Sequence, residues 1–339
     1  MKTKFLKRMV LWVLVIPLVV FAAILLIAFE KQDAIVQSQI ATLNTTYKGK
    51  ITISDSHLAP FASFPDISIK FDDVTVHESK EPNAAVILEV ATIYIGFNLW
   101  DIAGGYYDLH SLIIEDGFFD LVLHTDGITN LDNALASSAE NGDERPLDIH
   151  LQKIKLKNLD IHQREEATNM DIETLIYWAK GGFNNRNDQI AAHVDSAFEL
   201  NVIDNGDTTY FKNKHFEFHT DLVYNNKNGL LVFEPSGIRM EHGDLQLRGT
   251  VDTKNDMTVD IAVSGTKPSF DMFIAFAPTA LIPVLERYEN AGNIYFNATL
   301  QGPITKGRQP FIDARFGASE AYLENFAVNK RIDEMGFSG

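Results

Sequence analysis

The residues of this chain with the clearest potential for chemistry are two histidines that flank a glutamate in His215-Phe-Glu-Phe-His219. Residues two apart share one face of a strand, so His215, Glu217 and His219 would lie together and could ligate zinc through nitrogen and oxygen. No third histidine or second acidic cluster follows nearby at a recognisable ligand spacing. The same pattern is typical of a solvated strand face opposite buried Phe216 and Phe218. The sequence therefore predicts no metal site and no cofactor.

Motifs for nucleophilic and phosphate chemistry are missing from the sequence. It contains no cysteine and no Gly-x-Ser-x-Gly elbow. The segment Gly49-Lys-Ile-Thr52 lacks the upstream glycine and the context of a phosphate-binding loop. The carboxylate pairs Asp72-Asp73 and Glu165-Glu166 are expected at turns between strands, as solvated corners that discourage aggregation. We therefore predict that the protein is not an enzyme.

The charge balance excludes one class of partner. The chain carries 29 basic and 46 acidic side chains, a net charge of −17. Four of the basic residues, Lys2, Lys4, Lys7 and Arg8, precede a long apolar segment, so the remainder holds 25 basic against 46 acidic side chains, a net of −21. A surface so negative repels phosphate backbones and anionic headgroups. We expect no nucleic-acid binding, and any lipid should be held by its apolar tails.

That apolar segment runs without a charge from Met9 to Phe29. About 20 apolar residues match the roughly 30 Å hydrocarbon core of a bilayer, and flanking cations stay on the cytoplasmic side. A cleaved signal peptide has a shorter apolar region, of about 7 to 15 residues, whereas this run is longer and leads into Glu30 and Lys31. We therefore predict a single-pass anchor with a cytoplasmic N-terminus, a helix that continues to about Leu43, and an exported remainder.

Period-two alternation dominates the sequence after Tyr47. Apolar residues alternate with polar or small ones, which is typical of antiparallel strands with one buried and one solvated face. The strands expected on this basis are Ile67–Phe71, Ala91–Phe97, Phe119–Leu123, Leu147–Leu151, Phe216–Phe218, Leu245–Leu247, Val259–Val263 and Ile294–Leu300. We therefore predict a large one-sided β-sheet as the scaffold.

Three of the expected strands repeat one pattern. Residues 69–77 align with residues 154–162, and residues 112–124 carry a looser copy. In each copy the apolar residues change parity at an acidic, Asn or Gly position, as between Phe71 and Val74. One inserted residue of this kind bends a strand while its apolar side chains stay on the same face. We therefore expect bent strands that stack into a trough.

Helices are expected to be few. Asn130 should cap a short helix, and residues 98–105 predict a single helical turn stopped by glycines. The one long helical pattern after the anchor, Ser269 to Glu289, contains Pro278 and Pro283. These prolines should divide it into two short amphipathic helices packed on the sheet.

The apolar face of the predicted sheet needs a cover. The chain contains 23 Phe and 10 Tyr in addition to its rows of Ile, Val and Leu. A second sheet or helices would make a closed sandwich, whereas an apolar ligand would occupy an open groove. The residues alone leave both alternatives open.

The order of features along the chain resembles the AsmA family of Gram-negative envelope proteins. The basic N-terminus and the single anchor come first. The matching segments that follow are Gly49–Ile53, Phe64–Val76, Ala91–Phe97, Leu99–Gly105, Leu112–Leu121 and Asp126–Leu131, with a looser match at 156–162. The resemblance is therefore clearest over about the first 135 residues.

This resemblance implies a mainly β protein with an N-terminal transmembrane helix, an elongated, bent antiparallel sheet that forms a taco-like apolar groove, and a few short helices. It also implies a place in the inner (cytoplasmic) membrane, with the bulk of the chain in the periplasm. The groove would bind phospholipid acyl chains and contribute to phospholipid transport between inner and outer membranes and to outer-membrane biogenesis. The residues predicted to line it are Ile67, Ile69, Phe71, Ile93, Ile95, Phe97, Phe119, Leu121 and Leu123.

The corresponding domain scheme has five parts. These are residues 1–8 in the cytoplasm, 9–29 as the anchor, 30–136 as an AsmA-like N-terminal β domain, 137–146 as a polar linker or exposed loop, and 147–339 as a continuing β-groove domain. The sequence ends at Phe337-Ser-Gly339, just after a pattern that approaches another strand, so we expect the N-terminal part of a longer protein. The rival hypothesis is an anchored scaffold with a closed sheet, whose acidic surface recruits other envelope proteins during outer-membrane protein assembly or protein targeting to the membrane.

Overall fold

The computed structural model describes residues 36, 40–63, 66–98, 101, 109–137, 151–186, 188–208, 211–241, 243–254, 257–267, 270–277, 282–285, 287–303, 310–325 and 327–339. The predicted anchor lies outside these ranges, as do most of the helical turn expected at 98–105 and all of the predicted linker beyond Ser137. Among the described residues, no helix is both long and apolar enough to span a membrane. Residues 40–46, at the end of the helical pattern that follows the anchor, are helical.

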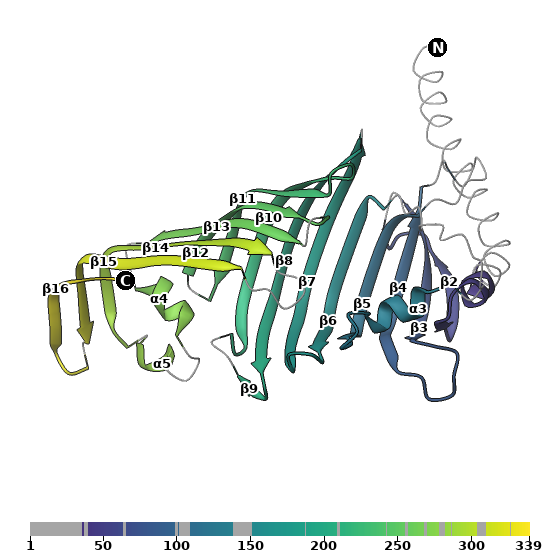
Figure 1. Ribbon diagram of the computed structural model, residues 1–339, viewed down its shortest axis with the longest axis horizontal. Coiled ribbons are helices and arrows are strands. Elements are labelled where there is room, and N and C mark those ends of the chain that lie inside the picture. Colours follow the sequence, from purple (N-terminus) through teal and green to yellow (C-terminus); the bar gives the residue numbers. More distant parts are fainter. Residues whose placement is uncertain are drawn as a thin grey trace, which may run out of the picture. The chain divides into compact units, whose positions relative to one another are not determined.

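All sixteen strands of the described residues belong to one sheet. They are β1 (Lys50–Thr52), β2 (Asp55–Ala59), β3 (Ile67–His77), β4 (Val86–Phe97), β5 (Leu109–Leu123), β6 (Lys153–Glu165), β7 (Met170–Arg186), β8 (Gln189–Asp204), β9 (Asp207–Thr208), β10 (Lys214–Asn225), β11 (Leu230–Met240), β12 (Gly243–Asp252), β13 (Thr258–Lys267), β14 (Glu289–Pro303), β15 (Phe311–Asn325) and β16 (Lys330–Ser338). The strand order is β1-β3-β4-β5-β6-β7-β8-β10-β11-β12-β13-β14-β15-β16, with β2 paired to β3 and β9 to β8 (Figure 1). Because β1 and β16 stand at opposite ends of this order, the sheet is open.

The sheet is mixed, whereas the sequence predicted an antiparallel one. Pairs such as β3 with β4 and β7 with β8 are antiparallel. β5 and β6 run parallel, because the amide of Glu166, which directly follows β6, donates to the carbonyl of Leu123, the last residue of β5, at 3.0 Å. Parallel neighbours need a long connection, and the helix α3 (Asn130–Leu135) lies in the one that joins these two strands. The antiparallel prediction was wrong here because alternation carries no information on strand direction.

The described residues form two compact units. The first unit extends to Gly117 and resumes from Ile128 to Leu151, and the second comprises Phe118–Gly127 and Gln152–Gly339. The chain therefore passes from the first unit to the second within β5, returns for α3, and enters the second unit again before β6.

Residues with positive φ mark the corners of the repeated strands. The φ angles are 50° at Asp73 in β3, 59° at Asp116 in β5 and 49° at Asn158 in β6. Short polar side chains such as these tolerate the left-handed region better than most others. On either side of Asp73 the apolar pairing continues, with Phe71 opposite Ile93 and Val74 opposite Val90. The predicted change of parity at an acidic or Asn position is confirmed, although Asp73 stands inside a strand rather than at a turn.

Alternation did not predict five of the long strands, namely β7, β8, β11, β15 and β16. In β7 the register with β8 shifts between Ile176 and Trp178, so Tyr177 is an extra residue that reverses the parity. In β8 the small residues Ala192 and Ser196 alternate with polar ones and weaken the apolar signal. Of the strand expected at 147–151, residues 147–150 lie outside the described ranges, and β6 begins at Lys153.

Short helices accompany the sheet, as expected. At α3 the Thr129 side chain accepts a hydrogen bond from the Asp132 amide while the Asp132 carboxylate accepts one from the Thr129 amide, each at 3.0 Å. This capping box makes Thr129 the N-cap, one residue before the predicted Asn130. The helices α4 (Asp271–Phe276) and α5 (Ile282–Leu285) divide the Ser269–Glu289 segment, and α4 lies against β12 and β13. The predicted division and the packing of α4 on the sheet are confirmed.

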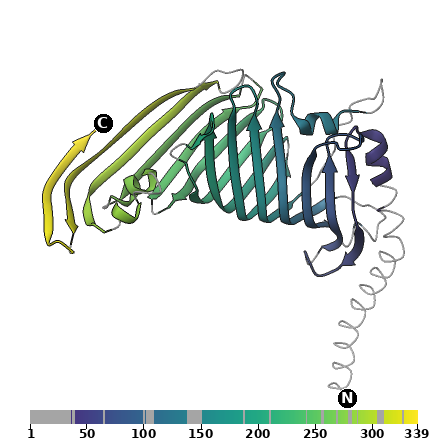
Figure 2. The same cartoon turned by 90° about the horizontal axis from the view of Figure 1, so that it is seen from below.

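The hydrophobic core of the second unit forms where α4 meets the sheet. Its buried members are Leu245, Met272, Ile294, Ala318 and Ala321. A Cβ atom at Gly265 would come within 2.6 Å of Leu245 and 2.8 Å of the Met272 sulfur, so glycine permits the close approach of α4. Figure 2 shows the strands of this unit as one curved layer with the two helices on one side.

Candidate functional site

The strands of the second unit separate apolar from polar side chains. Phe198 on β8 stands opposite Phe216 on β10, which stands opposite Met240 on β11. The rings of Phe198 and Phe216 stack with 5.2 Å between their centroids. Further along the same strands, Leu222 stands opposite Phe233. Apolar residues therefore meet in rows that cross the strands, and they give the second unit one apolar face.

This apolar face is only half-buried. Its partly exposed members are Ile154, Leu156, Ile161, Ile176, Phe198, Phe216, Phe218, Leu222, Phe233, Leu247, Ile261 and Leu300. In the part of the chain that the structure describes, every strand belongs to the one sheet, so no second sheet packs on this face. Helix α4 covers it near β12 and β13. Away from α4, the apolar side chains keep part of their surface accessible.

The nine predicted lining residues are divided between the two units. Six of them form three cross-strand pairs in the first unit, Ile67 with Phe97, Ile69 with Ile95, and Phe71 with Ile93. Ile67 and Ile69 are 1% and 8% exposed and are core residues, whereas the other four are half-buried. The remaining three, Phe119, Leu121 and Leu123, alternate along the end of β5 in the second unit and are half-buried. Seven of the nine therefore keep a partly accessible side chain.

One buried cation lies on the same side of the second unit as α4. Lys214 begins β10 opposite Leu200 and is 1% exposed. Its ammonium donates to the Ala277 carbonyl at 2.5 Å, at the C-terminal end of α4, where carbonyl groups lack helical partners. Burial lowers the pKa of Lys214 below its ordinary value, although the charge of Glu241 opposes this shift. Lys214 thus ties α4 to the sheet.

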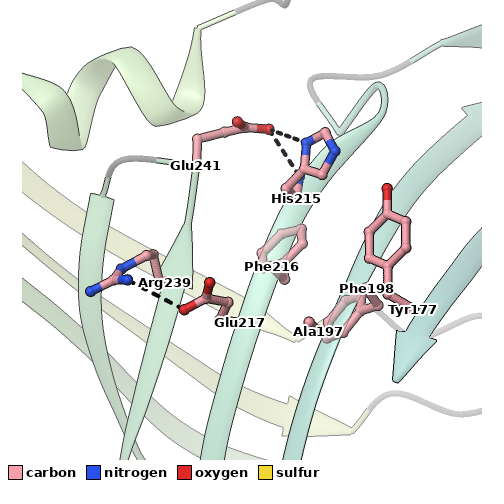
Figure 3. Close-up of a pocket in the computed structure, with 8 residues that line it drawn as sticks. All are labelled: Tyr177, Ala197, Phe198, His215, Phe216, Glu217, Arg239 and Glu241. Carbon is pink, nitrogen blue, oxygen red and sulfur yellow. Dashed lines mark hydrogen bonds and ion pairs between the residues drawn. The ribbon is translucent and has the colours of Figure 1, made fainter. Parts of the chain in front are cut away.

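The opposite, polar side of these strands carries an open pocket of about 230 Å³ (Figure 3). Its His215 has one ring nitrogen 3.1 Å from Glu199 and the other 3.3 Å from Glu241. The Tyr177 hydroxyl donates to Glu199 at 3.0 Å, and burial together with this bond raises the pKa of Tyr177. Among the described lining residues there is no serine, threonine or cysteine that His215 could activate. The pocket holds paired charges rather than a recognisable nucleophile and base.

The three residues that the sequence suggested for zinc bind different partners. His215 pairs with the glutamates of the pocket, Glu217 lies 3.3 Å from Arg239, and His219 bonds to Asp195. Side chains two apart on one strand do share a face, as expected. Each side chain nevertheless pairs with a residue of a neighbouring strand rather than with the other two.

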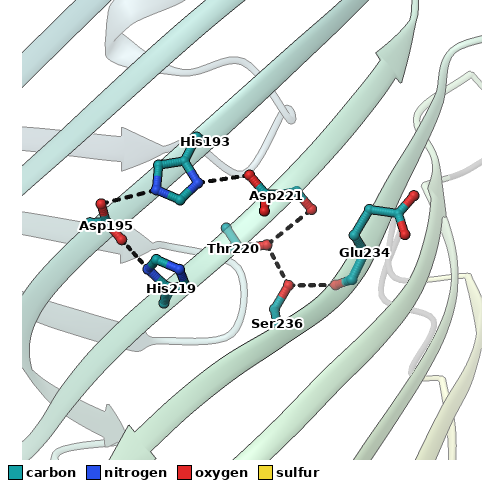
Figure 4. A network of polar contacts seen from close by, with 7 residues as sticks. All are labelled: His193, Asp195, His219, Thr220, Asp221, Glu234 and Ser236. Atoms are coloured by element: carbon teal, nitrogen blue, oxygen red, sulfur yellow. Dashed lines mark hydrogen bonds and ion pairs between the residues drawn. The ribbon is translucent and has the colours of Figure 1, made fainter.

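A different group of histidines and carboxylates forms between β8 and β10, and we call it the His-Asp cluster (Figure 4). His193 and Asp195 lie on β8, and His219 and Asp221 lie opposite them on β10. The hydrogen bond with Asp221 raises the pKa of His193, although burial opposes it. Burial raises the pKa of Asp195, but its bond with His219 and the charge of His193 outweigh this and leave the pKa lowered.

Sequence reasoning missed this cluster, although a signal for it exists. The spacing His-x-Asp occurs at His193-Val-Asp195 and again at His219-Thr-Asp221. Two copies on antiparallel neighbours can set each histidine opposite an aspartate. Only the register between β8 and β10 shows that they do so.

A scan of protein-family models, a search of curated proteins and a search of solved structures each found no match to this chain. The resemblance to the AsmA family therefore stays a prediction.

Proposed function

We propose that this protein binds phospholipid acyl chains along its apolar face and acts as an AsmA-like protein of the inner membrane. In this role it contributes to phospholipid transport between the inner and outer membranes and to outer-membrane biogenesis. The observation that carries the proposal is the half-buried apolar face of the second unit, over which the described residues place no second sheet. Large accessible apolar surfaces mark sites for partners, ligands or membranes.

The chemistry of this face suits a flexible hydrocarbon chain. Pockets for small polar ligands combine an apolar lining with a few polar groups that fix orientation. Here two polar residues on that side, Thr220 and Ser236, are buried and bond to each other at 2.5 Å. Contact along the rows is therefore apolar, and each CH₂ group removed from water contributes about 0.8 kcal/mol. Such a surface favours acyl chains without selecting a headgroup.

Charge supports the same orientation of the lipid. The whole chain has a net charge of −17, and the opposite side of the strands carries acidic residues such as Glu199, Glu217 and Glu241. Anionic headgroups are repelled by such a surface. The tails would therefore lie on the apolar face while the headgroups stay in water.

The rival function is a membrane-anchored scaffold that recruits envelope proteins through its acidic surface. It requires a cover for the apolar face, because a large exposed apolar area promotes aggregation. α4 covers one part of that face, and the partly exposed members such as Leu222 and Phe233 favour a lipid occupant over a closed sheet.

Photo-crosslinking in living Gram-negative cells tests the proposal. The full chain would carry p-benzoylphenylalanine at Phe218 or Leu222 on the apolar face, or at Glu217 or Gln246 on the polar side as matched controls. After irradiation, mass spectrometry of the purified protein should find phospholipid adducts at the two apolar positions and none at the controls. The two strands involved, β10 and β12, should stay intact because each variant changes one partly or fully exposed position.

Two outcomes would contradict the proposal. One is a properly folded protein without lipid adducts at either apolar position. The other is protein adducts at Glu217 or Gln246 together with empty apolar positions, which would support the scaffold instead.

A further inference from the structure

The His-Asp cluster is built from two neighbouring cross-strand pairs. Asp195 stands opposite His219, and His193 stands opposite Asp221. Residues two apart on a strand share a face, so all four side chains lie on the polar side of β8 and β10. The pattern places a histidine next to an aspartate along each strand and also across the strands.

The contacts bring the ligand atoms to one point. The two carboxylate oxygens of Asp195 face different imidazoles, with Oδ2 3.1 Å from Nε2 of His193 and Oδ1 hydrogen-bonded to Nδ1 of His219. The two imidazole rings meet edge to face, with 4.9 Å between their centroids. One ligand atom from each of His193, Asp195 and His219 lies within 4.8 Å of the other two. Because zinc binds nitrogen and oxygen at about 2.0 to 2.2 Å, small side-chain rotations would enclose an ion.

The fourth residue orients one ligand. Asp221 Oδ1 lies 2.7 Å from Nδ1 of His193, which leaves Nε2 of His193 directed at Asp195. Histidines that bind metals commonly donate their other nitrogen to a carboxylate in this way. The register between β10 and β11 shifts between His219 and Leu222, where β11 contributes one extra residue, so Asp221 stands opposite a β-bulge of β11. Bulges of this kind are common next to functional sites.

The surroundings leave room for an ion and its water ligands. Gly182 on β7 stands opposite His193, and Gly237 on β11 stands opposite His219. A Cβ atom at either glycine would meet nothing within 4 Å. The cluster is therefore open to solvent on both sides.

The nearest basic side chain in the sheet register does not occupy this space. Lys180 stands opposite Asp195, but its ammonium lies over the ring of Trp178, 5.3 Å from the centroid. Asp195 and Asp221 bring two carboxylates to the cluster, and this donor set favours a divalent cation.

We propose that His193, Asp195 and His219 form a binding site for a divalent transition-metal ion such as Zn²⁺, with Asp221 as the carboxylate that orients His193. Two imidazoles and one carboxylate suit zinc and its neighbours, and the remaining positions stay open to water. The ion joins β8 to β10 beside the bulge. This site lies on the side of the strands opposite the acyl-chain surface, so it does not depend on the proposed lipid function.

A second group of similar composition serves as an internal comparison. Asp55, His57 and Asp72 also lie close together in the first unit. There Lys70 lies 2.6 Å from Asp72 and already supplies a positive charge. That group also has a single imidazole, so we expect it to bind zinc much more weakly.

Calorimetric titration of the full chain tests the site. The protein would be purified in detergent without a histidine tag, stripped with a chelator, and titrated with ZnCl₂ at pH 7.5. We expect one strong equivalent in the wild type, at least about tenfold weaker binding in His193→Gln and His219→Gln, and a loss of about 10 to 100-fold in Asp221→Asn. His215→Gln is the matched control, because His215 lies on the same strand as His219 and is also an exposed histidine between two carboxylates. This variant should bind zinc as the wild type does.

Two further measurements exclude a trivial effect of misfolding. Circular dichroism and the zinc-free melting temperature of each variant should match the wild type. X-ray absorption at the zinc edge should show two imidazoles and oxygen ligands at about 2.0 to 2.2 Å. The proposal is overturned if the wild type binds no stoichiometric zinc, or if the double variant of His193 and His219, folded by both criteria, retains the strong equivalent.

Discussion

The packing of α4 on the sheet makes a quantitative prediction for Met272→Ala. Met272 is 0% exposed and lies in the core formed with Leu245 and Ile294. Removing a buried methionine side chain costs about 2 to 5 kcal/mol, because the lost transfer free energy is joined by the free energy of the cavity left behind. A helix of six residues is not stable on its own in water. The substitution should therefore lower the free energy with which α4 is held on the sheet.

Hydrogen exchange measures that attachment directly. A loss of about 2 to 5 kcal/mol corresponds to roughly 30 to 4,000-fold faster exchange, since each 1.4 kcal/mol is a factor of ten. In the full chain we expect this acceleration in peptides that cover residues 270–277, up to the limit set by unprotected amides. The strands β6 to β8, which are separated in the strand order from the strands β12 and β13 that pack against α4, should keep their protection.

Met257→Ala is the control for the chemical change. Met257 is 40% exposed, so its truncation should leave the exchange of residues 270–277 within about twofold of the wild type, as expected for a surface position. Unchanged protection of α4 in Met272→Ala would refute the reasoning that Met272 holds the helix to the sheet. Equal acceleration throughout the second unit would show instead that the unit opens as a whole.

Three further substitutions probe other contacts. Gly117→Ala should lower the melting temperature, because the new Cβ would come 2.1 Å from the Glu89 carbonyl oxygen, whereas Gly336→Ala, whose Cβ would meet only an atom at 3.6 Å, should change it little. Thr129→Ala removes the cap of α3 and should destabilise that helix by about 0.5 to 2 kcal/mol, measured as faster exchange of its amides. Burial lowers the pKa of Lys214, so between that lowered value and its ordinary 10.5 the unfolded chain binds the extra proton and stability rises with pH. Melting temperatures of Lys214→Met should lack this rise, and an identical pH profile in the two proteins would contradict it.

Much of the fold could be predicted because its signals are local. Alternation at Ile93, Ile95 and Phe97 identifies β4 without reference to any partner. Asp73 and Asn158 mark corners because a short polar side chain tolerates positive φ within its own residue. Steric preferences of this kind depend only on the residue and its chain neighbours, so they can be recognised in the sequence.

The partners across the sheet could not be predicted in the same way. Alternation is the same in a parallel and an antiparallel strand, so nothing near Leu123 indicated that β5 would pair with a parallel β6. The strand β7 was missed because Tyr177 reverses the parity at a bulge, and a bulge is defined by the strand beside it. Whether Ile67 would line a groove or lie in the core also depended on residues that pack over it from other segments.

The sequence by itself determined many of the strands, their bends, the division of the Ser269–Glu289 segment into two short helices, and an apolar face that needs a cover. Those properties follow from side-chain size, polarity and backbone sterics over a few residues. Only the tertiary structure decided that α4 packs against β12 and β13, and that His219 meets Asp195 rather than His215 and Glu217. Both outcomes depend on register and packing between distant segments, because a shift of one residue would move every side chain of a strand to the other face.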